Sequence, residues 1–198
     1  MAIIQATDEN FDGVIAEGVF LIDFYTTHCG PCRALLPTLL EVEGAFPSMK
    51  LIKVNLDDCK QLADRFHIDS TPTLFLGKDG TFAEYEGYRE SEFFLKAIAD
   101  LYYGRAAVNI SATEQKPSEH KPSEQKTKNK REARVRLNED EEIVRTVREG
   151  LKAKNGYCPC RVQKTPENKC MCKEFREQIE DENFEGYCHC KLYYKEYV

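Results

Sequence analysis

The stretch VFLIDFYTTHCGPCRALLPTLLEV, residues 19–42, contains the two patterns that decide the fold of the N-terminal half of the chain. Its first seven residues, 19–25, are almost continuously apolar, which is typical of a strand buried on both faces of a sheet. Over residues 31–46 the apolar side chains recur at helical spacing, which predicts a helix with a broad apolar face. Two cysteines lie where the strand ends and the helix begins, so we expect their sulfurs to be close enough for a disulfide.

The spacing of these cysteines, in Cys29-Gly30-Pro31-Cys32, favours redox chemistry. A helix N-terminus stabilises a thiolate at Cys29, whereas Cys32 lies one turn further in and is expected to be better shielded. This asymmetry suits a dithiol in which one sulfur attacks and the other resolves. The alternative is half of a zinc site, but the nearest other cysteine in this half is Cys59, which is unpaired and which we interpret as a structural thiol.

Strand and helix patterns alternate on both sides of this stretch, over residues 1–104. Residues 77–80, Gly-Lys-Asp-Gly, predict the turn of an antiparallel hairpin. The order βαβαβαββα indicates an α/β domain, a mixed sheet with flanking helices. The other strands are expected at 3–6, 50–56, 73–76 and 81–88, and the other helices at 10–17, 60–66 and 91–102.

Two motifs of this domain, DFYTTHCGPC at 23–32 and STPT at 70–73, resemble the thioredoxin family. The resemblance covers residues 1–104 and implies a thioredoxin fold. It also implies that Cys29 is the nucleophile of a disulfide reductase and that Cys32 is the resolving thiol.

The same resemblance assigns roles around the two cysteines. A cis peptide bond would precede Pro72 beside the disulfide and leave the Thr71 backbone free to pair with a substrate chain. Asp23, buried under the sulfurs, would accept the proton of Cys32, with Lys53 as its charged neighbour. His28 stands where the family usually has tryptophan, and a protonated imidazole there would lower the pKa of Cys29, whereas a plain surface histidine would not.

Residues 105–133 have the composition of a flexible linker. Lys-Pro-Ser-Glu occurs twice, at 116–119 and 121–124, and residues 111–130 include no large apolar side chain that could offset the entropy cost of ordering. The segment is basic, but it contains no aromatic residue to stack on a base, and glutamates dilute its positive charge. We therefore predict a solvated linker and not a nucleic-acid site.

Residues 134–198 predict a second, small and mainly helical domain. Apolar residues recur at helical spacing over 140–153, Asn155-Gly156 is a plausible stop, and a second short helix is expected at 173–179. Sixty-odd residues with so few aliphatic side chains cannot easily form a stable core alone. We therefore expect additional crosslinks to hold this domain together.

Three C-x-C pairs supply candidates for those crosslinks. Zinc sites usually use C-x₂₋₄-C, and six thiols are two more than a single zinc ion or [4Fe–4S] cluster requires. Four ligands and one redox dithiol account for all six. The pairs are Cys158-Pro159-Cys160, Cys170-Met171-Cys172 and Cys188-His189-Cys190.

This pattern, CPC first and CHC last, resembles the catalytic subunit of ferredoxin:thioredoxin reductase over residues 136–198. The resemblance implies a disulfide between Cys160 and Cys190, with Cys160 as the exposed sulfur that attacks the target. His189 would handle protons nearby, although a histidine that merely spaces the two cysteines is the alternative. The spacing departs from the plant-type pattern, because the longer gap comes second here. The implied ligands of a [4Fe–4S] cluster are Cys158, Cys170, Cys172 and Cys188.

Together these motifs predict a ferredoxin-dependent disulfide reductase with its thioredoxin attached. Ferredoxin would be the electron donor and disulfide-containing client proteins the acceptors; the chain has no Gly-rich dinucleotide fingerprint that would bind NADPH or FAD. The alternatives are a thioredoxin with a zinc-binding interaction module, or an iron–sulfur redox sensor without turnover. The N-terminus lacks the pattern of a signal peptide, and no apolar run approaches a membrane span, so we expect a cytoplasmic monomer.

Overall fold

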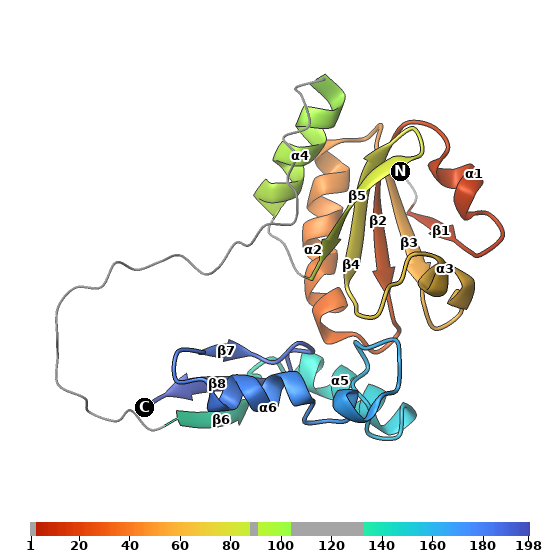
Figure 1. The fold of residues 1–198 in the computed structure, drawn as a ribbon. Coiled ribbons are helices and arrows are strands. Elements are labelled where there is room, and N and C mark those ends of the chain that lie inside the picture. Colours follow the sequence, from red (N-terminus) through yellow and green to blue (C-terminus); the bar gives the residue numbers. More distant parts are fainter. Residues whose placement is uncertain (1–2, 88–90, 104–132) are drawn as a thin grey trace, which may run out of the picture.

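The computed structural model describes residues 3–87, 91–103 and 133–198. They form two domains, and the C-terminal domain lies against one end of the N-terminal domain (Figure 1). The predicted linker, apart from residue 133, lies outside the described residues.

The N-terminal domain is a five-stranded mixed sheet in the order β1-β3-β2-β4-β5, with helices on both faces. Strands β1, β3 and β2 are parallel, whereas β4 and β5 are antiparallel to their neighbours. The types of these elements and their order along the chain agree with the expected βαβαβαββα. The elements are β1 (Ile4–Ala6), α1 (Phe11–Ile15), β2 (Val19–Tyr25), α2 (Gly30–Ala45), β3 (Lys50–Asn55), α3 (Lys60–Arg65), β4 (Thr73–Lys78), β5 (Thr81–Glu86) and α4 (Ser91–Tyr103).

The hairpin turn between β4 and β5 is shorter than predicted. Gly77 and Lys78, which were expected in the turn, belong to β4 and pair with Phe82 and Thr81. Only Asp79 and Gly80 form the turn, and both have positive φ angles, of 49° and 80°. Position 77 requires glycine for a different reason, because a Cβ there would collide with the carbonyl oxygen of Thr81 and with the ring of Phe20.

Strand β2 lies at the centre of the domain and separates two apolar layers. Its side chains alternate between the faces, so Phe20, Ile22 and Phe24 pack with helices α1 and α3. Val19 and Leu21 pack on the other face with α2 and α4. This two-sided burial confirms the strand that the apolar run predicts, and it places Asp23, two residues after Leu21, on the face that α2 covers.

The C-terminal domain contains more β-structure than predicted. Both predicted helices are present and helix still exceeds strand, but the prediction did not include a three-stranded antiparallel sheet, in the order β6-β8-β7. Both outer strands are short, and Ala133, the first residue of β6, falls at the end of the predicted linker. The elements are β6 (Ala133–Leu137), α5 (Glu141–Ala153), the 3₁₀ turn η1 (Pro166–Asn168), α6 (Lys173–Glu180), β7 (Gly186–Tyr187) and β8 (Tyr193–Tyr197).

A buried lysine fixes β8 to the end of α6. Lys195 is only 1% exposed, and its ammonium donates to the carbonyl oxygens of Gln178 and Asp181, at 3.2 and 2.5 Å. These carbonyls lie in the last turn of α6 and just after it, where helical partners are missing. The ammonium also donates to the hydroxyl of Tyr197, at 2.9 Å.

Across the described part of the chain, no helix is long and apolar enough to cross a membrane.

Candidate functional site

Cys29 and Cys32 form a disulfide at the start of α2. Cys29 is the N-cap residue of the helix, and its sulfur accepts a hydrogen bond from the backbone N–H of Cys32, at 3.1 Å. The free N–H groups of a helix N-terminus stabilise negative charge at this position. The sequence-based assignment of Cys29 as the nucleophile therefore has a physical basis in the fold.

The loop before β4 lies beside this disulfide. The Thr71–Pro72 peptide bond is cis, as the resemblance to thioredoxin implies, and the Cys29 sulfur lies 3.5 Å from the carbonyl oxygen of Thr71. Asp23 is fully buried, and one carboxylate oxygen lies 2.8 Å from the ammonium of Lys53. Burial raises the pKa of Asp23, and the charge of Lys53 offsets part of that rise. Its exchange of a proton with Cys32 stays a prediction.

The C-terminal domain binds this loop through its own backbone. The N–H of Thr71 donates to the carbonyl oxygen of Cys160, and the N–H of Val162 donates to the carbonyl oxygen of Asp69, both at 2.8 Å. Ser70 and Arg161 form an antiparallel bridge between these two bonds. Residues 159–162, called the docked segment below, therefore extend the loop at residues 69–71, called the client edge, as an additional strand would.

Side chains strengthen the same contact. The hydroxyl of Thr26 donates to the carbonyl oxygen of Pro159, at 2.9 Å, and is buried. The ammonium of Lys154 donates to the same oxygen, at 2.9 Å, and to the carbonyl oxygen of Arg161, at 3.1 Å. Burial lowers the pKa of Lys154, with the charge of Asp57 opposing that effect. The backbone carbonyls of the docked segment are thus fixed from both domains.

Helices α2 and α5 form the second part of the interface, and two glycines allow their close approach. A Cβ on Gly30 would lie 2.8 Å from a methyl group of Val147, and a Cβ on Gly150 would lie 2.5 Å from the Cβ of His28. At the rim, the guanidinium of Arg33 lies 2.7 Å from the carboxylate of Glu142 and donates to the hydroxyl of Thr146, at 2.6 Å.

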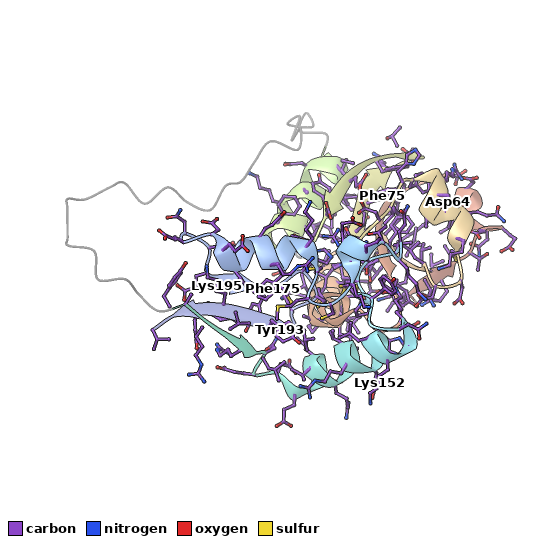
Figure 2. The ribbon with its side chains drawn as sticks, turned by 60° about the horizontal axis from the view of Figure 1, so that its bottom comes forward. Asp64, Phe75, Lys152, Phe175, Tyr193 and Lys195 are labelled. Atoms are coloured by element: carbon purple, nitrogen blue, oxygen red, sulfur yellow. A yellow bond between two sulfur atoms is a disulfide. The ribbon has the colours of Figure 1, made fainter. Side chains whose placement is uncertain are left out.

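The six C-terminal cysteines gather behind this interface in one apolar cluster with Cys29 and Cys32. The cluster also includes Phe175, whose ring stacks on that of Tyr193 with centroids 6.1 Å apart (Figure 2). Cys160 and Cys190 are free thiols here, so the disulfide expected between them is not formed in this structure.

Four of these cysteines fall into two groups, one with a lowered pKa and one with a raised pKa. Hydrogen bonds from Cys160 and Cys190 lower the pKa of Cys158 to about 3, and a hydrogen bond from Cys190 lowers that of Cys188. Burial and the neighbouring Cys158 raise the pKa of Cys160 well above its ordinary value, and hydrogen bonding to Cys158 does the same for Cys190. Two predicted iron ligands therefore favour the thiolate, and the two predicted redox sulfurs favour the thiol.

The other two predicted ligands differ from this pattern. Burial raises the pKa of Cys170 to about 11, and the negative charges of Cys158, Cys188 and Cys172 add to that rise. The pKa of Cys172 is raised by burial too. The charges of these four cysteines therefore interact, and a positively charged group near them would relieve their mutual repulsion. Within the described ranges, no three His, Cys, Asp or Glu side chains are arranged as a preformed site for a metal ion.

Comparison with known proteins concerns the N-terminal domain. The thioredoxin family model matches residues 2–100. The chain is 39% identical over 93 residues to a thioredoxin of Chlamydia pneumoniae, covering 46% of this chain and 91% of the relative. It is 38% identical over 85 residues to a thioredoxin of Bacillus subtilis, covering 42% and 82%. This chain belongs to the thioredoxin family. Among solved structures, oxidised mitochondrial thioredoxin 3 of Saccharomyces cerevisiae is similar, with 31% identity, a TM-score of 0.46, and coverage of 50% of this chain and 94% of that one.

The docked arrangement changes two expectations about exposure in this thioredoxin. Cys32 was predicted to be better shielded than Cys29, but Cys29 is 1% exposed and Cys32 is 5% exposed. Cys160 was predicted to be the exposed sulfur of its domain, and it is fully buried. The physical reason is the same in both cases, because each domain covers the reactive sulfur of the other.

His189 lies between Cys188 and Cys190, and its Nε2 is buried without a hydrogen-bond partner. Burial lowers the pKa of His189, and the nearby charge of Arg161 lowers it further. The imidazole therefore favours its neutral form, which could accept a proton, but its role stays a prediction.

Sequence reasoning missed the residues that join the thioredoxin domain to its neighbour. Thr26, Arg33 and Val162 lie in contacts between distant parts of the chain, which no local pattern indicates. Gly150 did carry a signal, because a glycine inside a helix destabilises it and therefore needs another reason.

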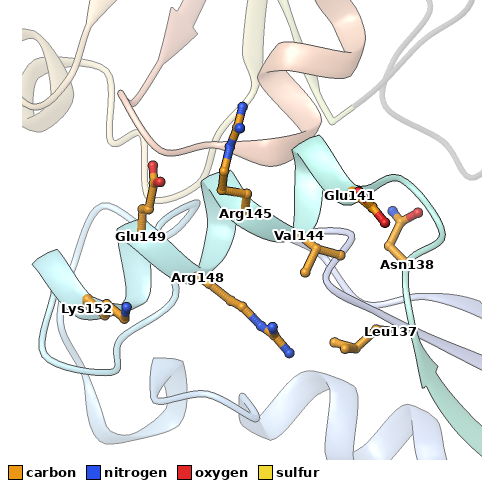
Figure 3. A pocket seen from close by; sticks show the side chains of 8 residues that line it. All are labelled: Leu137, Asn138, Glu141, Val144, Arg145, Arg148, Glu149 and Lys152. Carbon is orange, nitrogen blue, oxygen red and sulfur yellow. The ribbon is translucent and has the colours of Figure 1, made fainter.

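A pocket on α5 was also missed, and it lies apart from the sulfurs. It has a volume of about 460 Å³, and side chains from α5 and from the segment before it surround it (Figure 3). Because none of its lining residues is a cysteine, it is not part of the redox site. The lining residues are Leu137, Asn138, Glu141, Val144, Arg145, Arg148, Glu149 and Lys152.

Proposed function

We propose that this chain is a ferredoxin-dependent disulfide reductase whose C-terminal domain reduces its own thioredoxin domain. The thioredoxin family membership shows a disulfide oxidoreductase with Cys29 and Cys32 as its redox pair. The observation that supports the finer proposal is the hydrogen bond from the Thr71 N–H to the carbonyl oxygen of Cys160. It holds Cys160 at the loop that also contacts Cys29, where an attacking thiol has to lie.

The cysteines of the C-terminal domain suit a cluster in number and chemistry. Thiolate sulfur is the usual protein ligand of iron–sulfur clusters, and the proposed ligands are Cys158, Cys170, Cys172 and Cys188. Burial raises the pKa of Cys170 to about 11, and the negative charges of Cys158, Cys188 and Cys172 add to that rise; a bound cation would offset the part that is due to charge. When bound, a [4Fe–4S] cluster supplies electrons one at a time, as ferredoxin delivers them.

The transfer between domains is a pair of thiol–disulfide exchanges. The Cys160 thiol loses its proton and attacks the sulfur of Cys29, a Cys160–Cys29 disulfide forms, and Cys32 leaves as a thiolate that takes up a proton, so this exchange needs no net proton. The Cys190 thiol then loses its proton to solvent and attacks Cys160, so that a Cys160–Cys190 disulfide forms and Cys29 is released as a thiolate. Two electrons pass to the thioredoxin pair, and two electrons from ferredoxin later reduce Cys160–Cys190 again.

The surrounding residues prepare this step. The proposed first exchange starts from a Cys29–Cys32 disulfide and a free Cys160 thiol, and the state of these cysteines in the structure is consistent with that start. The N–H of Gly30 hydrogen-bonds the Cys160 sulfur and lowers its pKa, against the larger effect of burial. Asp23, whose pKa burial raises, can hold a proton for Cys32 and return it during client reduction.

The division of the six cysteines is tested by three substitutions in protein purified without oxygen. Cys160→Ser should retain iron and its brown colour but lose ferredoxin-driven reduction of Cys29–Cys32. Cys172→Ser should lose iron and unfold the C-terminal domain, because the cluster crosslinks that domain. Cys59→Ser is the matched control, since Cys59 is also a buried free thiol but belongs to the apolar core between the sheet and α3.

The outcomes also separate the alternatives. Loss of iron from Cys160→Ser would refute the proposed ligand set, and so would a stable, iron-bound Cys172→Ser. A colourless protein that contains zinc would favour an interaction module. Iron-containing protein that ferredoxin reduces, but that never passes electrons to Cys29–Cys32, would be a sensor instead.

A further inference from the structure

The client edge of the thioredoxin domain is fully occupied in this structure. Its two outward backbone groups, the N–H of Thr71 and the carbonyl of Asp69, are paired with Cys160 and Val162 of the docked segment. Bound client chains are expected to use the same backbone groups, because an extended peptide pairs with an exposed strand edge. The docked segment therefore takes the place of a client.

The side chains of the docked segment make the contacts that a client segment would make. Its cysteine lies opposite Thr71, and the following Arg161 lies 3.8 Å from the carboxylate of Asp69. Val162, two residues after the cysteine, packs against the apolar core between the sheet and helices α1 and α3. The docked segment thus presents to this edge a cysteine, then a basic residue, then an apolar one.

The nucleophile is covered as well. Cys29 is 1% exposed, because the docked segment and α5 lie over it. A client disulfide has to touch the Cys29 sulfur to be attacked, so it cannot react while the domains are docked.

We infer that the C-terminal domain competes with client proteins for the client edge, so that this thioredoxin reduces clients only after the two domains separate. The docked segment acts as an internal substitute for an extended client polypeptide that carries a cysteine followed by a basic and then an apolar residue. The inference goes beyond the proposed electron donor, since it concerns access to Cys29 and not the source of its electrons.

The contact between Arg33 and α5 offers a way to open the interface without replacing a reactive cysteine. Arg33 lies on the thioredoxin domain and pairs with Glu142 across the rim, where both side chains are half exposed or more. Arg33→Glu would place two carboxylates together and favour separation. Arg65→Glu is the matched control, because Arg65 is equally exposed and forms a similar ion pair, with Asp12, away from the interface.

The experiment measures one turnover with insulin as the client. Each protein carries Cys160→Ser, so that only Cys29 and Cys32 supply electrons, and it is reduced with dithiothreitol, which is then removed. The Cys29 thiolate attacks an insulin disulfide, Cys32 resolves the mixed disulfide, and two electrons and two protons pass to insulin. Arg33→Glu should accelerate this oxidation about twofold or more, which is what the loss of one exposed ion pair allows. Arg65→Glu should match its parent.

A second readout and a rescue complete the test. Amide hydrogen exchange at Thr71 and Val162 should become faster in Arg33→Glu, because those two N–H groups are bonded across the interface. Adding Glu142→Arg should restore both the slow exchange and the slow insulin reaction. Faster exchange without faster insulin reduction would overturn the inference, and so would unchanged exchange and rate. Both readouts use protein that retains its iron and neither uses ferredoxin, so failure here is distinct from failure of the proposed donor.

Discussion

Replacement of Gly150 by alanine should separate the domains by adding a single methyl group. The new Cβ would lie 2.5 Å from the Cβ of His28, across the interface, and 2.7 Å from that of Pro159, in the same domain as Gly150. Carbon atoms in contact are about 3.5–4.0 Å apart, so α5 has to withdraw from the thioredoxin domain by about 1 Å. Such overpacking typically costs about 1–3 kcal/mol.

The substitution also stabilises the helix itself, but this does not change the docking equilibrium. Alanine in place of glycine stabilises a helix interior by about 0.5–1 kcal/mol, but this gain is present in both docked and separated domains. The clash with His28 exists only when the domains are docked, so the ratio of docked to separated molecules should fall by roughly fivefold to a hundredfold.

The assay is the trapped disulfide between Cys160 and Cys29. In a chain that also carries Cys32→Ser and Cys190→Ser, neither resolving thiol is present. Added oxidised glutathione accepts two electrons and two protons as the Cys29 and Cys160 thiols join, so this disulfide accumulates within one chain. Non-reducing mass spectrometry of its peptides should show a much lower yield after Gly150→Ala. Gly44→Ala is the control, since Gly44 lies near the end of α2 and a Cβ there meets nothing within 4 Å. An unchanged yield in Gly150→Ala would show that the close approach of α5 does not hold the domains together.

Two further changes test buried charges. Burial raises the pKa of Asp23 above its ordinary 3.8, so the folded state binds the carboxyl proton more tightly than the unfolded state does. The free energy of unfolding therefore falls as the pH rises from about 3.8 through the raised pKa. Asp23→Asn should remove this fall and raise the melting temperature more at about pH 7 than near pH 4. Asp12→Asn is the control and should give no such gain at pH 7, because Arg65 lowers the pKa of the Asp12 carboxylate. Equal gains for Asp23→Asn at both pH values would contradict the assignment. Lys195→Met should cost the C-terminal domain about 2–4 kcal/mol in denaturant unfolding, because two carbonyls lose a charged donor, and the exposed Lys152→Met should cost almost nothing. A small loss for Lys195→Met would mean that water replaces the ammonium.

The sequence predicted the thioredoxin domain well because its signals are local. The apolar run of β2, the helical spacing of α2 and the Cys-Gly-Pro-Cys motif each determine structure within a few residues. The short strands β6 and β8 were missed for the opposite reason. Each has only five residues, and they pair across more than fifty positions, so neither has a distinctive pattern by itself.

The sequence predicted roles for the cysteines but not which of them lie close together in space. Their spacing indicated a dithiol and four ligands, yet nothing in the sequence shows that Cys160 binds at Thr71, 89 positions earlier. That contact depends on backbone groups, which every residue has. Only the glycines at 30 and 150, whose missing side chains let α2 and α5 approach, left a trace of it in the sequence.

The two ends of the C-terminal domain lie next to each other. Ala133, in the first strand of the domain, pairs with Tyr197 at the end of the last one, at the end of the domain remote from α2 (Figure 1). A polypeptide could therefore be attached at either end without disturbing the surface that meets Cys29. The domain has the geometry of an interchangeable module, and fusing it before the thioredoxin domain instead of after it should be compatible with the same contacts.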